Sequence, residues 1–302
     1  MHQTPLARIA PRCIPILLLL MAGCSADAAT PDPTWPAAIP TGGDTDARKR
    51  EQAVAALVAV RAAPRDEQRI IWYGRRIAYL GLYDDAIEIY SKGLKVHPES
   101  PRLLRHRGHR YISLRRFRDA ITDFDRARRM IEVAADEVEP DGMPNARNIP
   151  TSTLHTNIWY HYGLAHYCRG EFAAALRHYK QCLAAAKNPD MEVATRYWLF
   201  LTATRLDQKD EAARYLAPVR ADWDVIENHA YHQLLLLYRG EKTRADMRSS
   251  GDAIKDKTMG YGLARHLFLI GDTAAGEAAL REVAAGGSPA FGSIAAEADL
   301  KR

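Results

Sequence analysis

Two stretches of the sequence repeat each other, and this repetition decides the expected fold. Residues 70–98 are IIWYGRRIAYLGLYDDAIEIYSKGLKVHP, and residues 104–130 are LRHRGHRYISLRRFRDAITDFDRARRM. Small and aromatic residues recur between them at a constant offset of 34 residues. A period of this length is typical of stacked helical repeats. The matching pairs are Gly74 and Gly108, Tyr83 and Phe117, Ala86 and Ala120, Tyr90 and Phe124, and Gly93 and Ala127.

The residue types at these positions have a physical reason. Small side chains allow two antiparallel helices to approach closely, and aromatic side chains fill the seam to the next unit. A third copy, IWYHYGLAHYCRGEFAAALRHYKQCL, covers residues 158–183. We predict structural roles in the three copies for Gly74, Ala86, Tyr90, Pro98, Gly108, Ala120, Phe124, Ala127, Trp159, Gly163, Ala175 and Tyr179.

The period and these residue types resemble the tetratricopeptide repeat, a helix-turn-helix unit of 34 residues. Weaker copies fit residues 193–219, 231–247 and 261–283, and the amphipathic stretch that follows Ser288-Pro289 suits a capping helix. No region alternates with the period of two that strands require. We therefore predict an all-α fold, a right-handed superhelical α-solenoid of roughly five to six helical hairpins with flanking cap helices.

The beginning of the chain indicates a leader. Residues 14–28, IPILLLLMAGCSADA, form an apolar run that ends at a cysteine, and this run is too short for a permanent membrane span. Met21-Ala22-Gly23-Cys24 resembles the lipobox of bacterial lipoproteins, which implies cleavage before Cys24 and its acylation. Ser25 after the cysteine implies an outer-membrane lipoprotein that faces the periplasm. The alternative is an ordinary secretory signal with a secreted or soluble periplasmic product.

The rest of the chain divides by composition. We predict a signal peptide over residues 1–23, a flexible Pro/Ala-rich spacer over 24–46, and an N-terminal cap helix with two repeat units over 47–135. An inserted loop over 136–152 contains three prolines and no periodicity, so we expect it to be functional or disordered. Further repeat units and the C-terminal cap helix occupy 153–302.

The cap helix should begin after Thr45-Asp46, and Val54, Leu57, Val58 and Ala62 recur along it at helical spacing.

Charge and cysteine content narrow the function classes. Removal of the leader takes Arg8 and Arg12 with it and lowers the formal net charge from +5 to +3, so the mature chain is only mildly basic. This small charge and the predicted export argue against a nucleic-acid partner. Cys168 and Cys182 are expected on successive helices, beyond disulfide reach, as small buried residues.

Motifs for catalysis are absent from the sequence. There is no GxSxG, GxxxxGK[ST], HExxH or CxxC. His155, His161, His166 and His178 cluster in the third unit, and His229 and His232 share a helix face, which leaves a zinc-dependent hydrolase as a remote alternative. Their spacing does not converge on one face, so we predict no enzyme, no cofactor and no metal site.

The second repeat is unusually rich in arginine. Between Arg102 and Arg129 the sequence contains ten arginines and three aspartates. By phase with the tetratricopeptide pattern, the first helix of each unit lines a concave groove, which implies a partner-binding site. The expected groove residues are Arg75, Tyr79, Arg102, Arg105, His109, Tyr160, His161 and Tyr167.

Arginine clamps carboxylates with two hydrogen bonds, so this groove should prefer an acidic or C-terminal peptide segment. Ile71 and Arg75 stand where the tetratricopeptide domains that clamp chaperone tails carry Lys and Asn. Alternatively, the arginines lie on a solvated face and pair with the aspartates of the same chain.

The layout as a whole, a lipobox, a spacer and several units, resembles the NlpI-type lipoproteins. This resemblance implies a non-enzymatic scaffold of the cell envelope, anchored to the membrane by lipid and bound to another envelope protein. A second hypothesis is a binder of anionic envelope polymer or lipid head groups through the arginine-rich repeat. A homodimer through the first helix or an exposed end of the array is a further expectation.

Overall fold

The structure is a computed structural model that describes residues 1–2 and 32–302. The signal segment, Cys24 and the first part of the spacer lie outside the described residues, so their roles stay predictions. In the described part, the chain forms thirteen α-helices, one short 3-10 helix and one isolated bridge between Val138 and Thr153, with no strand. The all-α prediction is confirmed. The helices are α1 (Ala47–Ala62), α2 (Glu67–Tyr79), α3 (Tyr83–Val96), α4 (Pro101–Ser113), α5 (Phe117–Ile131), α6 (Leu154–Cys168), α7 (Phe172–Ala185), α8 (Pro189–Arg205), α9 (Lys209–Leu216), α10 (His229–Tyr238), η1 (Arg244–Asp246), α11 (Ala253–Leu269), α12 (Thr273–Ala284) and α13 (Phe291–Asp299).

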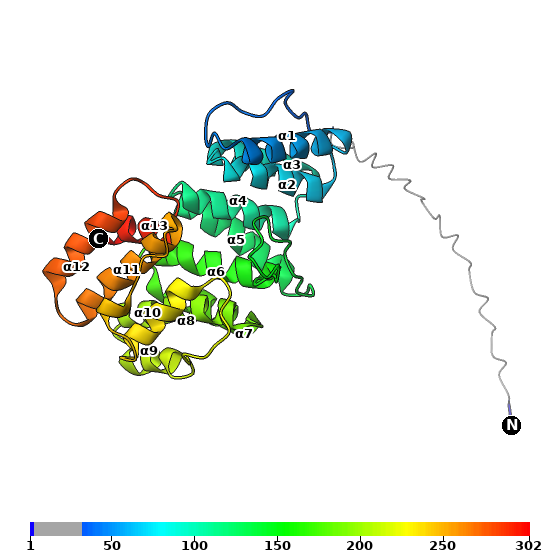
Figure 1. The fold of residues 1–302 in the computed structure, drawn as a ribbon. Coiled ribbons are helices and arrows are strands. Elements are labelled where there is room, and N and C mark those ends of the chain that lie inside the picture. Colours follow the sequence, from blue (N-terminus) through cyan, green and yellow to red (C-terminus); the bar gives the residue numbers. More distant parts are fainter. Residues whose placement is uncertain (3–31) are drawn as a thin grey trace. The chain divides into compact units, whose positions relative to one another are not determined.

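Consecutive helices pack as antiparallel hairpins (Figure 1). In the described residues there are five such pairs: α2 with α3, α4 with α5, α6 with α7, α8 with α9, and α11 with α12. Each of the first three hairpins also packs on the next, through α3 and α4, α5 and α6, and α7 and α8. The predicted array of helical repeats is therefore confirmed, while α1, α10 and α13 stand outside the hairpins.

One contact recurs in the first three hairpins and explains the 34-residue pattern. A β-carbon added to Gly108 would lie 2.8 Å from the Phe124 ring, and one added to Gly163 would lie 2.8 Å from the Tyr179 ring. Gly74 faces the ring of Tyr90 in the same way. Because these distances are too short for a side chain, the glycine is what lets the two helices of each hairpin close on the aromatic ring.

The turns inside the hairpins also recur. Every one of the five turns contains one residue with a positive φ, between 54° and 87°. Three of these residues are glycines, which adopt this conformation without steric cost. The other two are Arg115 and Asp207, which hold it despite a side chain. The glycines are Gly81, Gly170 and Gly271.

Side-chain caps start several of the helices. Asp46 accepts a hydrogen bond from the backbone N–H of Lys49, as predicted for the start of α1. Ser100 caps α4 ahead of Pro101, and Thr153 forms a capping box with Thr156 at the start of α6. These caps satisfy N–H groups that have no partner within the helix.

The segment before α1 packs on the helices. Trp35 meets Tyr73 edge to face at a centroid distance of 6.0 Å, and the backbone N–H of Asp44 donates to Leu80 O at 2.7 Å. The prediction of a flexible spacer is therefore wrong for residues 32–46, because an aromatic side chain and a backbone hydrogen bond hold them to α2.

The buried face of α1 also differs from the prediction. Ala53, Leu57 and Val60 are buried against the core, whereas Val54 and Val58 are 47% and 62% exposed. The apolar side chains of α1 are spread over a larger part of its circumference than the face that packs on α2.

The fifth predicted unit, over residues 231–247, does not form a hairpin. Its first half is α10, but its second half contains only the 3-10 turn η1, in which Thr243 and Asp246 cap each other. The segment that follows, Arg248-Ser249-Ser250-Gly251, offers no apolar face that would be buried by a second helix. α10 packs instead on α8 and α11.

The last helix, α13, folds back onto the array. It packs on α11 and α12 and also reaches α6, in the third hairpin. Arg115, in the turn of the second hairpin, donates to Glu297 of α13 at 2.8 Å and to Ser288 O at 2.9 Å. The predicted cap helix exists, and it covers part of the side of the array formed by α2, α4 and α6. We call this side the first-helix side.

Two further expectations concern cysteines and membranes. Cys168 and Cys182 are both buried and free, as predicted, and burial raises the pKa of the Cys182 thiol to about 12. Among the described residues, no helix is both long and apolar enough to cross a membrane.

Candidate functional site

The inserted loop lies over the first-helix side and binds two of the predicted groove arginines. Arg102 forms a bidentate pair with Glu137 and also contacts Glu67 at 2.9 Å. The hydrogen bond with Glu137 raises the pKa of Arg102. Arg105 contacts Glu139 at 2.8 Å, and both side chains are almost buried. These two arginines are therefore occupied by carboxylates of the same chain.

Two more arginines hold the backbone of this loop. The Arg75 guanidinium donates to Pro140 O at 2.7 Å and to the Tyr79 hydroxyl at 3.2 Å. Arg76 donates to Gly142 O at 3.2 Å. The loop is ordered by these contacts and is not a separate segment, so the prediction that Arg75, Arg102 and Arg105 line an open groove is wrong.

Most of the arginine-rich second repeat is also paired within the chain. Arg107 forms a bidentate contact with Asp123 at 2.7 and 2.8 Å, and both groups are largely buried. Four arginines pair with the three aspartates as the alternative stated, whereas Arg102, Arg105 and Arg115 pair with glutamates from other parts of the chain. The arginines with a carboxylate partner are Arg102, Arg105, Arg107, Arg115, Arg116, Arg128 and Arg129.

The predicted groove residues of the third unit are buried. The Tyr160 hydroxyl lies 3.0 Å from the Tyr231 hydroxyl and accepts from Trp198 Nε1 at 2.7 Å. Tyr167 is fully buried, and its hydroxyl lies 2.8 Å from that of Tyr261. The prediction that Tyr160, His161 and Tyr167 face an open groove is wrong, because α10, α11 and α13 fold over α6.

His161 shows this closure most directly. Its ring lies 5.5 Å from Phe291 of α13 and 4.3 Å from His109 of α4. Burial, aided by the charge of Arg105, lowers the pKa of His161 to about 3, so its imidazole is neutral at pH 7. The hydrogen bond between its Nδ1 and Asn157 O, at 2.6 Å, fixes the ring.

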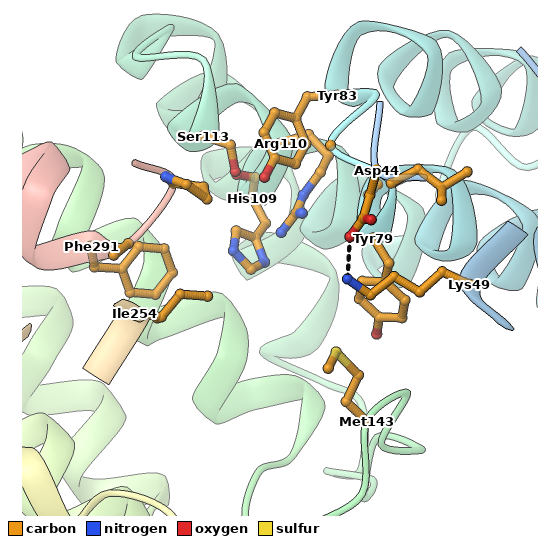
Figure 2. A pocket seen from close by; sticks show the side chains of 15 residues that line it. Asp44, Lys49, Tyr79, Tyr83, His109, Arg110, Ser113, Met143, Ile254 and Phe291 are labelled. Carbon is orange, nitrogen blue, oxygen red and sulfur yellow. Dashed lines mark hydrogen bonds and ion pairs between the residues drawn. The ribbon is translucent and has the colours of Figure 1, made fainter. Parts of the chain in front are cut away.

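A hollow remains on the first-helix side over the first two hairpins (Figure 2). We call it the N-terminal cleft. It encloses about 500 Å³ between the ends of α2 and α4, the segment that leads into α1, and the starts of α11 and α13. Its apolar lining includes Tyr79, Tyr83, Met143, Ile254 and Phe291.

Two of these apolar side chains lie exposed at the cleft. Met143, from the inserted loop, is 65% exposed, and Ile254, from the first turn of α11, is 56% exposed. Large apolar side chains with this exposure are available for contact with another molecule.

The polar groups of the cleft are few. Lys49 and Asp44 pair with each other, so their charges cancel. Burial, together with the neighbouring charge of Arg110, lowers the pKa of His109 well below its usual value and keeps it neutral. Tyr79 and His109, two of the predicted groove residues, both line this cleft.

Arg110 is the remaining charge, and its guanidinium points into the hollow between His109 and Tyr79 (Figure 2). It stacks on the Tyr83 ring at 5.3 Å. Within residues 32–302, its guanidinium forms no ion pair and no hydrogen bond. Burial lowers its pKa, but an arginine stays charged at any physiological pH. The cleft therefore carries one uncompensated positive charge among apolar walls.

The clustered histidines form no metal site in the described part of the chain. There, no three His, Cys, Asp or Glu side chains lie close enough to hold a metal ion. His166 contacts Glu171 at 2.6 Å, His178 stacks on Tyr162 at 3.8 Å, and His232 lies 2.8 Å from Arg220 O. These three histidines thus each have a packing or hydrogen-bonding partner of their own.

Sequence reasoning missed the residues that make the cleft distinctive. Arg110 is one arginine among ten in its repeat, and no local pattern shows that it lacks a carboxylate partner and points into a cleft. Met143, Ile254 and Phe291 come from a loop and two later helices, and only the folded chain brings them together. The one signal in the sequence is Ile254, which is the single large apolar residue in the polar stretch from Gly251 to Lys257.

Comparisons with known proteins yield structural likeness only. No protein-family model matches the chain, and no curated protein sequence matches it. The crystal structure of MamA is 17% identical, with a TM-score of 0.44, over 68% of this chain and all of that one. YrrB, described as a TPR protein with an unusual peptide-binding site, is 14% identical, with a TM-score of 0.44, over 83% of this chain and all of that one.

A third likeness, to a chain of the Naa15/Naa10 complex bound to HypK-THB, is 12% identical with a TM-score of 0.38. It covers 85% of this chain but 32% of that one.

Proposed function

We propose that this protein is a non-enzymatic adaptor that holds a segment of a partner protein in the N-terminal cleft. The observation that carries this proposal is the open, mainly apolar hollow with an unpaired arginine, on the first-helix side of a helical-repeat array. Its volume of about 500 Å³ lies in the range of small-ligand and peptide-side-chain pockets. Apolar contact with a few polar anchors is the usual basis of peptide recognition.

The cellular setting is a separate part of the proposal. The sequence around Cys24 supports a lipid anchor in the outer membrane, with the array facing the periplasm and holding an envelope partner near the membrane. Mass spectrometry of the mature protein from native membranes tests it: an acylated N-terminus at Cys24 is expected, and an uncleaved or unmodified N-terminus would contradict it.

Binding of anionic polymer through the second repeat finds less support. Seven of its ten arginines already pair with carboxylates of the chain, so little free charge remains to attract a polyanion. For a homodimer through α1, the supporting observation is the exposure of Val54 and Val58. Sedimentation of wild type and of a Val54→Lys, Val58→Lys variant tests that association.

The test of the adaptor function uses peptides from a random display library selected on the mature chain. Their affinity is measured by fluorescence anisotropy for the wild type, for Ile254→Gln at the cleft, and for Leu269→Gln. Leu269 is the matched control, because it lies on the same helix, is 43% exposed and does not line the cleft.

We expect Ile254→Gln to lower the affinity about fivefold through lost apolar burial of about 1 kcal/mol, and Leu269→Gln to leave it unchanged. Failure to select any binder, or equal affinity for all three proteins, would contradict the proposed function.

A further inference from the structure

Arg110 differs from the other arginines of α4 in having no anionic partner. Arg102, Arg105 and Arg107 on the same helix each bind a carboxylate. A guanidinium that is partly removed from water without a counter-charge loses hydration and gains nothing in exchange. A carboxylate that binds Arg110 would therefore form a strong ion pair, because the guanidinium is already desolvated and is held in place by the Tyr83 ring.

The chain itself shows what kind of ligand this side of the array accepts. Glu137 and Glu139, two residues apart around the bridge at Val138, both reach arginines of α4. The backbone that follows is held at Pro140 O by Arg75. An extended acidic segment therefore lies across the first turns of α4, with its side-chain carboxylates as the anchors.

Arg110 continues this series beyond the end of the segment. It stands five residues after Arg105 on α4, which a rise of ~1.5 Å per residue converts into roughly 7.5 Å along the helix axis. The inserted loop does not reach it, although Met143 of the loop lines the same cleft. Arg110 is thus the one arginine of α4 that has no carboxylate partner among the described residues.

The residues around Arg110 favour a bound anion, and they indicate which groups should lie next to that anion in the ligand. Lys49 and Asp44 cancel, Arg105 is compensated by Glu139, and His109 is neutral, so Arg110 is the uncompensated charge among the residues that line the cleft. Tyr79, Phe291 and Ile254 supply apolar surface around the charge. A ligand that complements this site carries one carboxylate next to apolar side chains.

We infer that Arg110 is the anion anchor of the N-terminal cleft, and that it binds the side-chain carboxylate of an Asp or Glu within an extended partner segment whose neighbouring apolar residues pack on Phe291 and Ile254. This inference rests on the proposed function and names the chemistry of its ligand. The commitment to a side chain, rather than to a free C-terminus, follows from Glu137 and Glu139, which are side chains of a continuing chain.

The experiment selects binders from a random 12-residue library displayed inside a loop of a carrier protein, so that no peptide has a free C-terminus. Selected sequences are then measured against the wild type, Arg110→Gln, Arg110→Lys and Arg118→Gln. Arg118 is the matched control because it is exposed on α5 and lies outside the cleft. Each peptide is also made with its acidic residue changed to the amide.

We expect selected sequences to share an acidic residue beside an apolar one. Arg110→Gln should lower their affinity at least tenfold. Arg110→Lys should lower it less, since lysine keeps the charge but not the paired hydrogen bonds. Arg118→Gln should leave the affinity unchanged. Changing the acidic residue of the peptide to its amide should cause the same loss on the wild type and no further loss on Arg110→Gln.

This last comparison keeps the test valid if Arg110→Gln lowers stability, because the amide peptide leaves the protein unaltered. Binders that depend on Ile254 but lose nothing when Arg110 or their acidic residue is changed would overturn the inference and leave the adaptor function standing. If the peptides selected in the adaptor test depend on Arg110 only through their free C-terminal carboxylate, and no loop-displayed binder depends on Arg110, the inference would also be overturned. A library that yields no binder sensitive to Ile254 would overturn both proposals.

Discussion

The first three hairpins and the region from α8 to α13 are built by different means. In α2 to α7, one contact, a glycine against the aromatic ring of its partner helix, occurs three times: Gly74 and Gly108 are 34 residues apart, and Gly163 follows after the inserted loop. From α8 onwards the sequence follows the repeat pattern less closely, and α10 has no hairpin partner. Hydrogen bonds and ion pairs between buried polar groups connect the helices there. The Tyr160 hydroxyl is hydrogen-bonded to both Trp198 and Tyr231. The Asp299 carboxylate forms ion pairs with three arginines.

This difference explains where the N-terminal cleft lies. Neighbour-to-neighbour packing leaves the first-helix side of the early hairpins without a helix to cover it. The later helices make long-range contacts, and α13 places Phe291 against His109 and His161. The cleft is the part of the first-helix side that neither α13 nor the inserted loop fills. The proposed binding site therefore depends on the irregular half as well as on the repeats.

The largest effect should come from Asp299, which holds the irregular half together. Its carboxylate is almost buried, contacts Arg302, Arg205 at 2.8 Å and Arg265 at 3.6 Å, and accepts from the Tyr261 hydroxyl at 2.8 Å. Asp299→Ala leaves these arginines without their shared counter-charge, so we expect a loss of about 4 kcal/mol in the free energy of unfolding.

Urea denaturation measures this loss, and hydrogen exchange should show α13 released first. The control is Glu277→Ala, which removes an exposed pair with Arg281 on α12 and should cost less than about 0.5 kcal/mol. Equal stability of the two variants would refute the role of Asp299.

A slightly smaller effect is expected in the regular half. Gly163→Leu places a side chain where a β-carbon would already lie 2.8 Å from the Tyr179 ring, so we expect about 3 kcal/mol of destabilisation from overpacking. Ala173→Leu, on the exposed outer side of the same hairpin, is the control and should change stability by less than about 0.5 kcal/mol. If Gly163→Leu is as stable as the control, the close approach is not what sets the repeat.

The inserted loop offers a comparison within one segment. Glu139→Gln removes the counter-charge of the nearly buried Arg105 and should cost about 2 kcal/mol, whereas Glu137→Gln, at a half-exposed pair, should cost less than about 1 kcal/mol. Thermal unfolding of the two variants measures the difference. The reverse order would mean that burial does not decide the strength of these pairs.

The smallest effect concerns pH at the junction between the two regions. His161 is neutral in the fold with a pKa of about 3, whereas in the unfolded chain it takes up a proton near pH 6.5. Its contribution to stability is therefore complete above pH 6.5 and is lost as the pH falls from 6.5 towards 3.

Between pH 7.5 and 5.5 this amounts to about 1 kcal/mol from His161 alone. Urea midpoints at the two pH values should differ by that much less in His161→Gln than in the wild type. His229→Gln, at an exposed position, should keep the full difference. An unchanged pH dependence in His161→Gln would exclude the junction as its source.

Prediction from sequence succeeded where the signal is local. Gly74, Gly108 and Gly163 were placed correctly because each contacts an aromatic residue 16 positions later in its own hairpin. It failed for Val54 and Val58, since the face that α1 buries depends on the surface α2 offers. Prediction failed again for Tyr160 and Tyr167. Their positions within the repeat place them on the first helix of a unit, but they do not show that later helices pack over that helix.

The sequence by itself determined most of the helices and, apart from α10, their pairing into hairpins, because helix propensity, capping and periodic burial act over about one repeat of the chain. Only the tertiary structure decided which surfaces stay open. The loop that occupies Arg102 and Arg105, the return of α13, and the isolation of Arg110 all depend on contacts between segments far apart in sequence. Such contacts form when apolar surfaces and charges find partners in three dimensions, and no local pattern specifies the partner.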